Sequence, residues 1–229
     1  MIYDSVSATI KLHYEFHLPE GAEKAPLLIA VHGYAAHMGY MMREAKLVAP
    51  EGFAIASIQG PNRFFRPTED GQYKLAFGWL SDFEPQEQVA LHHEFVLKVI
   101  DKHSEDGTID PDRVFLYGFS QACALNFRFA FANPDALKGL VGVCGGIPGD
   151  LDTSDLYQPT NAEVFYLYGD DDEFYAPEKL EAFDKRLDEY LPSYQSRKYV
   201  AKHEISQEMR SDIRKWLAGF PAEKQRTAS

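Results

Sequence analysis

The chain has 229 residues, of which 45% are hydrophobic and 14% aromatic, and its formal net charge is −12. This composition excludes a disordered or fibrous protein, and the negative charge argues against nucleic acid or an anionic membrane as the main partner. We therefore expect a single globular domain over residues 1–229 that acts on a neutral or weakly polar small molecule.

The two cysteines, Cys123 and Cys144, lack the spacing of a metal site. We expect both to be small buried residues in a reducing compartment, without a disulfide. The N-terminus has no basic region followed by an apolar segment, and the sequence has no apolar run long enough to cross a membrane. These features predict a cytoplasmic protein without stable membrane insertion.

The first predicted element is a half-buried strand, because apolar and polar residues alternate from residue 6 to residue 18. The later apolar runs do not alternate, which is typical of strands buried on both faces. These runs cover residues 27–31, 53–58, 114–117, 140–144, 164–168 and, less cleanly, 197–201.

Helical patterns separate most of these runs. They cover residues 40–49, 86–103, 121–132, 177–190 and 205–220. The alternation of strands and helices predicts an α/β fold, with a mainly parallel twisted sheet, helices on both faces and an antiparallel N-terminal strand. Residues 221–229 are expected to be a frayed tail.

Two connections, residues 59–83 and 145–162, are longer than a compact sheet requires. Residues 59–83 contain many aromatic residues, which suggests a lid or an apolar pocket that would favour an acyl or aryl group. The candidate pocket residues are Phe64, Phe65, Phe77 and Trp79. The alternative is that these aromatic residues cover an edge of the sheet.

A candidate nucleophile, Ser120, lies where the strand at 114–117 meets the helix at 121–132. The sequence GFSQA joins them without a loop, and so abrupt a turn strains its central residue and requires small neighbours. The helix N-terminus at this point offers unpaired N–H groups to an oxyanion. The alternative is that Ser120 only caps the helix.

A serine hydroxyl becomes a good nucleophile when an imidazole accepts its proton and a carboxylate orients that imidazole. In sheets of this type, the order along the chain is serine, acid, histidine. Of eight histidines, only His203 follows Ser120, and it lies just past the last predicted strand. His203 is therefore the candidate base, and the alternative is an exposed loop histidine.

The candidate acids are the four consecutive carboxylates Asp170, Asp171, Asp172 and Glu173, which follow the strand at 164–168. A solvated turn and the start of a helix account for two or three of them. One remains to pair with the histidine. The spacing from Gly169 favours Asp172, with Asp171 as the alternative.

Backbone N–H groups of Tyr34 and Gln121 are the candidate oxyanion donors, because Gly33 lets the chain turn at the sheet edge. His32 is expected to brace this turn, and His37 to lie at the surface near a helix start. His92 and His93 share a helical face with apolar residues, which favours packing over metal binding. We expect no metal site and no organic cofactor, since no phosphate-binding or dinucleotide motif occurs.

The motifs VHGY, GFSQA, GDDDEFYAP and KHEISQEMRSDIRKWL together resemble the α/β-hydrolase superfamily, specifically its phospholipase/carboxylesterase branch with acyl-protein thioesterases. The resemblance covers roughly residues 25–220. It implies Ser120 as nucleophile, Asp172 as acid, His203 as base, and Tyr34 and Gln121 as oxyanion donors. Dienelactone hydrolases are a neighbouring group, but they use cysteine as the nucleophile.

The chain departs from that branch in two places. Ala122-Cys123 stands where the branch usually has two glycines, and the acidic turn reaches Pro177 one residue later than expected. The second departure leaves Asp171 open beside Asp172.

We therefore expect a serine hydrolase that cleaves a small-molecule ester or thioester through an acyl-enzyme on Ser120. A peptidase or acyltransferase with the same triad is the nearest alternative. A ligand-binding protein that has lost turnover on the same fold is another. A homodimer is compatible with the sequence.

Overall fold

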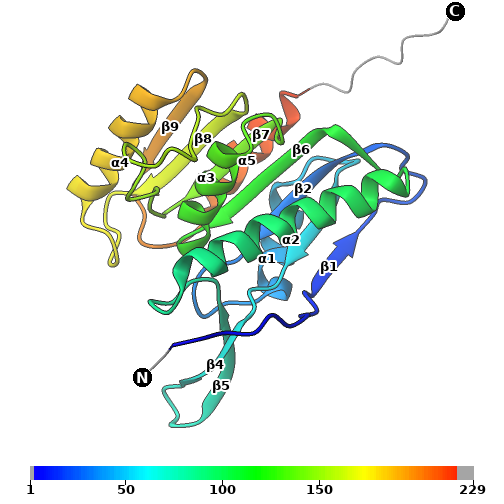
Figure 1. The fold of residues 1–229 in the computed structure, drawn as a ribbon. Helices are drawn as coiled ribbons and strands as arrows, with labels where there is room; N and C mark the ends of the chain where they lie inside the picture. The colour runs from blue at the N-terminus through cyan, green and yellow to red at the C-terminus, as the bar shows by residue number, and fades with distance from the viewer. Residues whose placement is uncertain (1–2, 221–229) are drawn as a thin grey trace, which may run out of the picture.

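The computed structural model describes residues 3–220, and its centre is a twisted sheet (Figure 1). Over these residues the sheet has seven strands in the order β1-β3-β2-β6-β7-β8-β9. Strand β1 is antiparallel to β3, and every other neighbouring pair is parallel. The strands are β1 (Tyr14–His17), β2 (Ala25–Val31), β3 (Ala54–Ile58), β6 (Ile109–Phe119), β7 (Gly139–Val143), β8 (Glu163–Gly169) and β9 (Tyr194–Tyr199). The predicted sheet is confirmed.

Helices cover both faces of this sheet, as predicted. They are α1 (Met38–Val48), α2 (Pro85–Glu105), α3 (Gln121–Ala132), α4 (Pro177–Tyr190) and α5 (Gln207–Ala218). Helices α2, α3 and α4 pack on one face, where Phe95, Phe127 and Leu187 belong to one buried cluster. Helices α1 and α5 pack on the other face through Met41 and Ile213. The sheet therefore separates two apolar cores, and none of the helices within residues 3–220 is long and apolar enough to cross a membrane.

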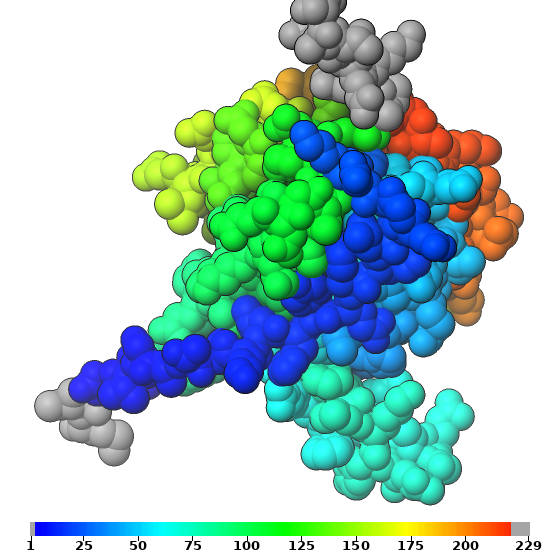
Figure 2. All heavy atoms as spheres, turned by 90° about the vertical axis from the view of Figure 1, so that its right-hand side faces the viewer, coloured from blue at the N-terminus to red at the C-terminus, as the bar shows by residue number. Residues whose placement is uncertain are grey.

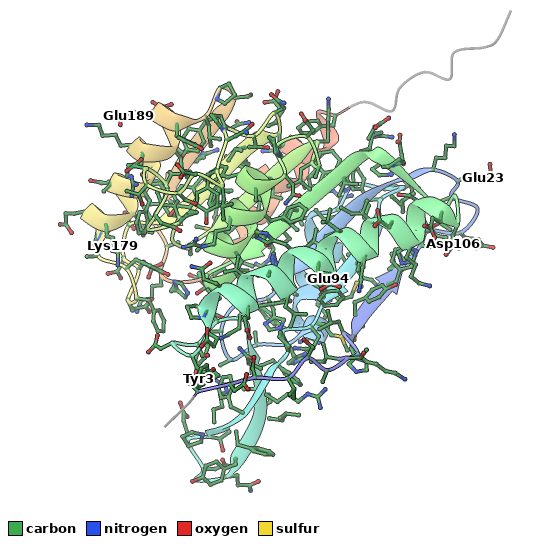
Figure 3. The ribbon with its side chains drawn as sticks, in the orientation of Figure 1. Tyr3, Glu23, Glu94, Asp106, Lys179 and Glu189 are labelled. Carbon is green, nitrogen blue, oxygen red and sulfur yellow. The ribbon has the colours of Figure 1, made fainter. Side chains whose placement is uncertain are left out.

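The first strand is shorter than predicted, because only residues 14–17 pair with β3. Strand β3 has five residues, and the chain leaves the sheet soon after Gln59, so the segment before His13 has no strand beside it. Val6 is 94% exposed. The segment instead brings the Tyr3 hydroxyl to the Glu84 carboxylate, near the start of α2 (Figure 3).

The last strand also differs from the prediction of a strand buried on both faces. In β9 only Tyr199 is buried. The reason is its place in the sheet: β9 is an edge strand with β8 as its one neighbour in the sheet. Such a strand is covered less completely than the central strands β2 and β7, in which every residue is buried.

The connection at residues 59–83 is not an irregular loop. It contains a β-hairpin of β4 (Asn62–Pro67) and β5 (Tyr73–Gly78), which forms a separate two-stranded sheet and projects from the body of the molecule (Figure 2). Gly71 in the turn has φ of +77°, which glycine adopts without strain. The sequence analysis treated residues 59–83 as a connection and missed these two strands. The predicted frayed tail at 221–229 lies outside the described residues.

Candidate active site

Ser120 occupies a strained turn between β6 and α3. It has φ of +57° and ψ of −120°, a conformation that non-glycine residues rarely adopt. Its side chain makes no capping hydrogen bond to α3, so the helix-cap alternative is wrong. The turn points the hydroxyl away from the helix backbone and toward the carboxyl edge of the sheet.

The turn is possible because its neighbours have little or no side chain. A Cβ added at Gly145 would lie 2.2 Å from the Ser120 carbonyl oxygen, and one at Gly118 would lie 2.4 Å from Asn126 Nδ2. That same Cβ at Gly118 would be 3.2 Å from the Cβ of Ala122. The alanine that replaces a glycine of the family pattern is thus accommodated because position 118 is glycine.

The structure brings Ser120, His203 and Asp172 into one chain of hydrogen bonds. His203 Nε2 lies 2.8 Å from Ser120 Oγ, and His203 Nδ1 lies 2.7 Å from Asp172 Oδ2. The Asp172 side chain is completely buried, whereas the neighbouring Asp171 is exposed. The residue in contact with the histidine is therefore Asp172 and not Asp171.

The hydrogen bonds of Asp172 determine the tautomer of His203. Asp172 Oδ1 accepts the backbone N–H groups of Phe174 at 2.8 Å and Tyr175 at 3.0 Å, which leaves Oδ2 for the imidazole. A carboxylate oxygen at His203 Nδ1 favours the tautomer with the proton on that nitrogen. The lone pair of Nε2 then faces the Ser120 hydroxyl, as a general base requires.

Two of the other acids in the run position the histidine loop. Glu173 Oε2 accepts the His203 backbone N–H at 2.9 Å, and this hydrogen bond lowers the pKa of Glu173. Asp170 Oδ1 accepts the backbone N–H of Ala201 at 3.3 Å. These acids thus hold the loop after β9 against the loop after β8. The sequence analysis had attributed two or three of the four acids to a solvated turn and the start of a helix.

Both candidate oxyanion donors line the cavity above Ser120. Gln121 is the first residue of α3, so its N–H has no acceptor within the helix. Within residues 3–220, the Tyr34 N–H donates no hydrogen bond to a backbone carbonyl. Gly33 brings the Tyr34 loop close, since a Cβ there would lie 3.1 Å from Ser120 Cβ.

The Tyr34 loop is braced by His32, as predicted. Its buried imidazole contacts the Gly33 carbonyl oxygen at 2.7 Å through Nδ1 and accepts the Gly60 N–H at 2.9 Å through Nε2. Burial lowers the pKa of His32 to about 4, so the ring is neutral and structural. His37 caps α1 by accepting the Tyr40 N–H.

The side chain of Gln121 has a role that sequence reasoning missed. Its Oε1 accepts the backbone N–H of Trp79 at 2.9 Å, and its Nε2 donates to the Leu80 carbonyl oxygen at 3.3 Å. The residue after the candidate nucleophile therefore ties the elbow to the segment that follows β5.

The cavity above Ser120 has a volume of about 960 Å³, and of the four predicted pocket residues only Phe64 lines it. Phe65 lies on the opposite face of β4 and is 68% exposed, and Phe77 lines a separate, smaller cavity. Trp79 is buried and donates its indole N–H to the His32 carbonyl. Strand alternation explains why Phe65 and Phe77 lie on the other face of the hairpin from Phe64. The aromatic lining that the sequence analysis missed is Tyr34, Tyr40, Phe119, Phe174 and Tyr175.

The other residues that the sequence analysis assigned to packing are His92 and the two cysteines, which are buried, and His93, which is half-buried. The His92 ring meets Trp79 edge-on and the His93 ring meets Phe129 edge-on. Cys123 and Cys144 are buried free thiols, and burial raises the pKa of Cys144 to about 12. Among residues 3–220, no group of three or more His, Cys, Asp or Glu side chains is arranged to hold a metal ion.

Residues 16–220 match the family model described as Phospholipase/Carboxylesterase. The chain belongs to this family. Over 169 residues it is 27% identical to "Putative esterase NocK" from Nocardia uniformis subsp. tsuyamanensis, a match that covers 69% of this chain and 44% of that protein. The chain thus matches less than half the length of this relative. The description of the family names phospholipase and carboxylesterase enzymes.

Solved structures of similar fold include the carboxylesterase of Bacillus cereus, with 16% identity, a TM-score of 0.68, and coverage of 91% of this chain and 94% of that chain. Acyl-protein thioesterase 2 of Zea mays also has 16% identity and a TM-score of 0.68, with coverage of 90% and 98%. At these identities the likeness shows the fold alone, which is the α/β-hydrolase fold.

Proposed function

We propose that the protein hydrolyses carboxylic esters or thioesters of small molecules through an acyl-enzyme on Ser120. The observation that carries the proposal is the continuous hydrogen-bond chain from Ser120 through His203 to the buried Asp172. The Ser120 hydroxyl lies at a cavity that Tyr34 and Gln121, the candidate oxyanion donors, also line, and this supports acyl transfer.

In the first half of the reaction, Ser120 Oγ attacks the carbonyl carbon while its proton passes to His203 Nε2. The carbonyl electron pair moves to the oxygen, which accepts hydrogen bonds from the N–H groups of Tyr34 and Gln121. Asp172 stabilises the imidazolium that forms. When the tetrahedral intermediate collapses, the bond to the leaving group breaks, and the leaving alcohol or thiol takes the proton from His203.

In the second half, a water molecule takes the place of the leaving group. His203 Nε2 accepts its proton as the water oxygen attacks the acyl carbon, and the same N–H groups stabilise the second oxyanion. Collapse releases the carboxylic acid and returns the proton from His203 to Ser120 Oγ. None of these steps uses a group other than the residues named and water.

The test is turnover of a neutral aryl ester and a matched thioester by the wild-type protein and the Ser120→Ala variant. We expect the substitution to lower kcat by about 10³-fold or more while the melting temperature changes little, because the hydroxyl acts as part of a unit and makes few packing contacts. Near-normal turnover by a folded Ser120→Ala protein would refute the assignment.

The same panel separates the proposal from its alternatives. An amide analogue of the ester tests for peptidase activity, and an added alcohol acceptor tests for acyl transfer. Binding of the ester without acid release would support a ligand-binding protein in place of an enzyme. Release of acid from ester or thioester, with little attack on the amide and little transfer, supports the hydrolase.

A further inference from the structure

The cavity above Ser120 is positively charged, although the chain has 35 acidic and 23 basic residues. Arg43, Arg66 and Lys74 all line it. Among the described residues of the lining, none is an aspartate or a glutamate. The local charge is therefore opposite to the overall charge, and a neutral ligand, which the overall composition favours, does not account for it.

Two of these cations lie opposite each other in the hairpin of β4 and β5. Arg66 on β4 pairs with Lys74 on β5, and strand alternation places both on the face that carries Phe64, which also lines the cavity. Like charges directly opposite each other destabilise an antiparallel strand pair. The hairpin therefore carries this pair of cations at the cavity although the pair lowers the stability of the hairpin.

No carboxylate in the described part of the chain forms an ion pair with Arg43, Arg66 or Lys74. Of the nearby acids, Glu44 is paired with Arg210, and the Asp172 carboxylate is completely buried behind His203. All three cations are exposed, so an anionic ligand in the cavity can reach them.

The acids of the hairpin itself lie in its turn. Asp70 accepts a hydrogen bond from the Thr68 hydroxyl, which lowers the pKa of Asp70, and neither Glu69 nor Asp70 lines the cavity. Apolar and aromatic side chains, among them Phe64 and Phe174, line the same cavity. The cavity thus combines an apolar surface with a cationic wall.

We propose that the substrate is an ester or thioester that carries a carboxylate or phosphate group, which binds Arg66 and Lys74 while the scissile carbonyl lies at Ser120. Arg43, on α1, adds positive charge to the same cavity. The inference rests on the proposed function, because it assigns the substrate class of that site. It replaces the neutral or weakly polar ligand expected from composition.

The test compares matched aryl esters. One pair differs only at the far end of the acyl chain: 4-nitrophenyl hexanoate is neutral, and the mono-4-nitrophenyl ester of adipic acid ends in a carboxylate. A third ester of similar length ends in a phosphonate and separates phosphate-like from carboxylate ligands. A second pair, 4-hexanoyloxybenzoate and its methyl ester, places the charge on the alcohol side.

The readout is the ratio of kcat/KM for the anionic ester to kcat/KM for its neutral counterpart. We expect the wild-type ratio to exceed that of an R66Q/K74Q variant by roughly 3- to 30-fold for at least one placement of the charge, which corresponds to two exposed ion pairs. The matched control is K46Q/K138Q, which removes two exposed cations outside the cavity lining and should keep the wild-type ratio.

The outcomes separate the two proposals. If the wild-type protein cleaves none of the esters, the proposed function fails. If it cleaves the neutral esters and the ratio is the same in wild type and R66Q/K74Q for both placements and for the phosphonate, the substrate class proposed here is wrong.

A second measurement needs no variant. Exposed ion pairs are screened by salt, so the wild-type ratio should fall as sodium chloride is raised. A ratio that does not change with salt would overturn the role of the two cations, even if R66Q/K74Q failed to fold.

Discussion

The role of Asp172 can be tested by one substitution whose effect follows from its hydrogen bonds. In Asp172→Asn, the amide oxygen is expected to take the place of Oδ1, because that atom accepts two backbone N–H groups at 2.8 and 3.0 Å. The amide NH₂ must then face His203 Nδ1, where Oδ2 now lies at 2.7 Å. An NH₂ donor forces Nδ1 to become an acceptor, so the imidazole proton moves to Nε2. That tautomer cannot accept the Ser120 proton.

The size of the effect follows from loss of the general base with the site otherwise intact. We expect kcat for a neutral aryl ester to fall by about 10³- to 10⁴-fold, which corresponds to about 4 to 5 kcal/mol of activation free energy. The matched control is Asp171→Asn, which makes the same substitution at the exposed neighbour. In both variants the new side chain has nearly the same shape as aspartate. The kcat of Asp171→Asn should stay within about threefold of wild type, because its side chain does not contact His203.

The assay is steady-state turnover, with circular dichroism melting to show that both variants fold. If Asp172→Asn kept near-normal kcat, or if Asp171→Asn lost as much activity, the tautomer argument would be refuted. The second result would favour Asp171, the alternative acid that the sequence left open.

Two other predictions concern the stability of the fold around the site. Gly145→Ala should destabilise the protein by about 1 to 3 kcal/mol in urea unfolding and reduce kcat, because its Cβ would lie 2.2 Å from the Ser120 carbonyl oxygen. Gly149→Ala is the control, since nothing lies within 4 Å of that Cβ, and equal unfolding midpoints for the two variants would contradict the prediction. The buried His32 should make stability depend on pH, because its pKa is lowered to about 4 in the folded protein from 6.5. Between these values the unfolded state binds the extra proton, so the free energy of unfolding falls as pH falls, by up to about 3 kcal/mol from this residue. In His32→Gln the slope of unfolding free energy against pH should be shallower over this range, and an unchanged slope would exclude the contribution.

The sequence predicted the sheet and the order of the site residues because strong local signals determine both. Buried parallel strands are continuous apolar runs, and each strand is followed by the loop that carries a site residue. Ser120, Asp172 and His203 follow β6, β8 and β9, so their side chains meet at one edge of the sheet. The choice between Asp172 and Asp171 depends on which carboxylate points into the protein. The spacing from Gly169 favours Asp172 but does not show the direction of either side chain.

The pocket was predicted less well, because its lining comes from segments far apart in the chain. Tyr34 and Phe174 follow β2 and β8, and Phe119 is the last residue of β6, so aromatic density along the sequence does not show that they meet. The hairpin had a local signal, since an Asp-Gly pair lies between two aromatic segments that form strands. With the hairpin identified, alternation would have separated Phe64 from Phe65 and placed Arg66 opposite Lys74.

The first strand was overestimated for a related reason. Alternation from residue 6 indicates a strand with two different faces, yet a strand also needs a neighbour to pair with. Strand β3 supplies that neighbour only as far as its own five residues and the bond from Gln59 N–H to the His13 carbonyl. The length of a partner strand is not visible in the segment itself.

The most direct test of the account is the intact mass of the protein after exposure to a fluorophosphonate, a probe that reacts with activated serine hydroxyls. Wild-type protein should gain one probe adduct, located by peptide mapping at Ser120, and Ser120→Ala should gain none under the same conditions. If folded wild-type protein gains no adduct, or gains it at another residue, Ser120 is not the activated nucleophile and the proposed mechanism is wrong.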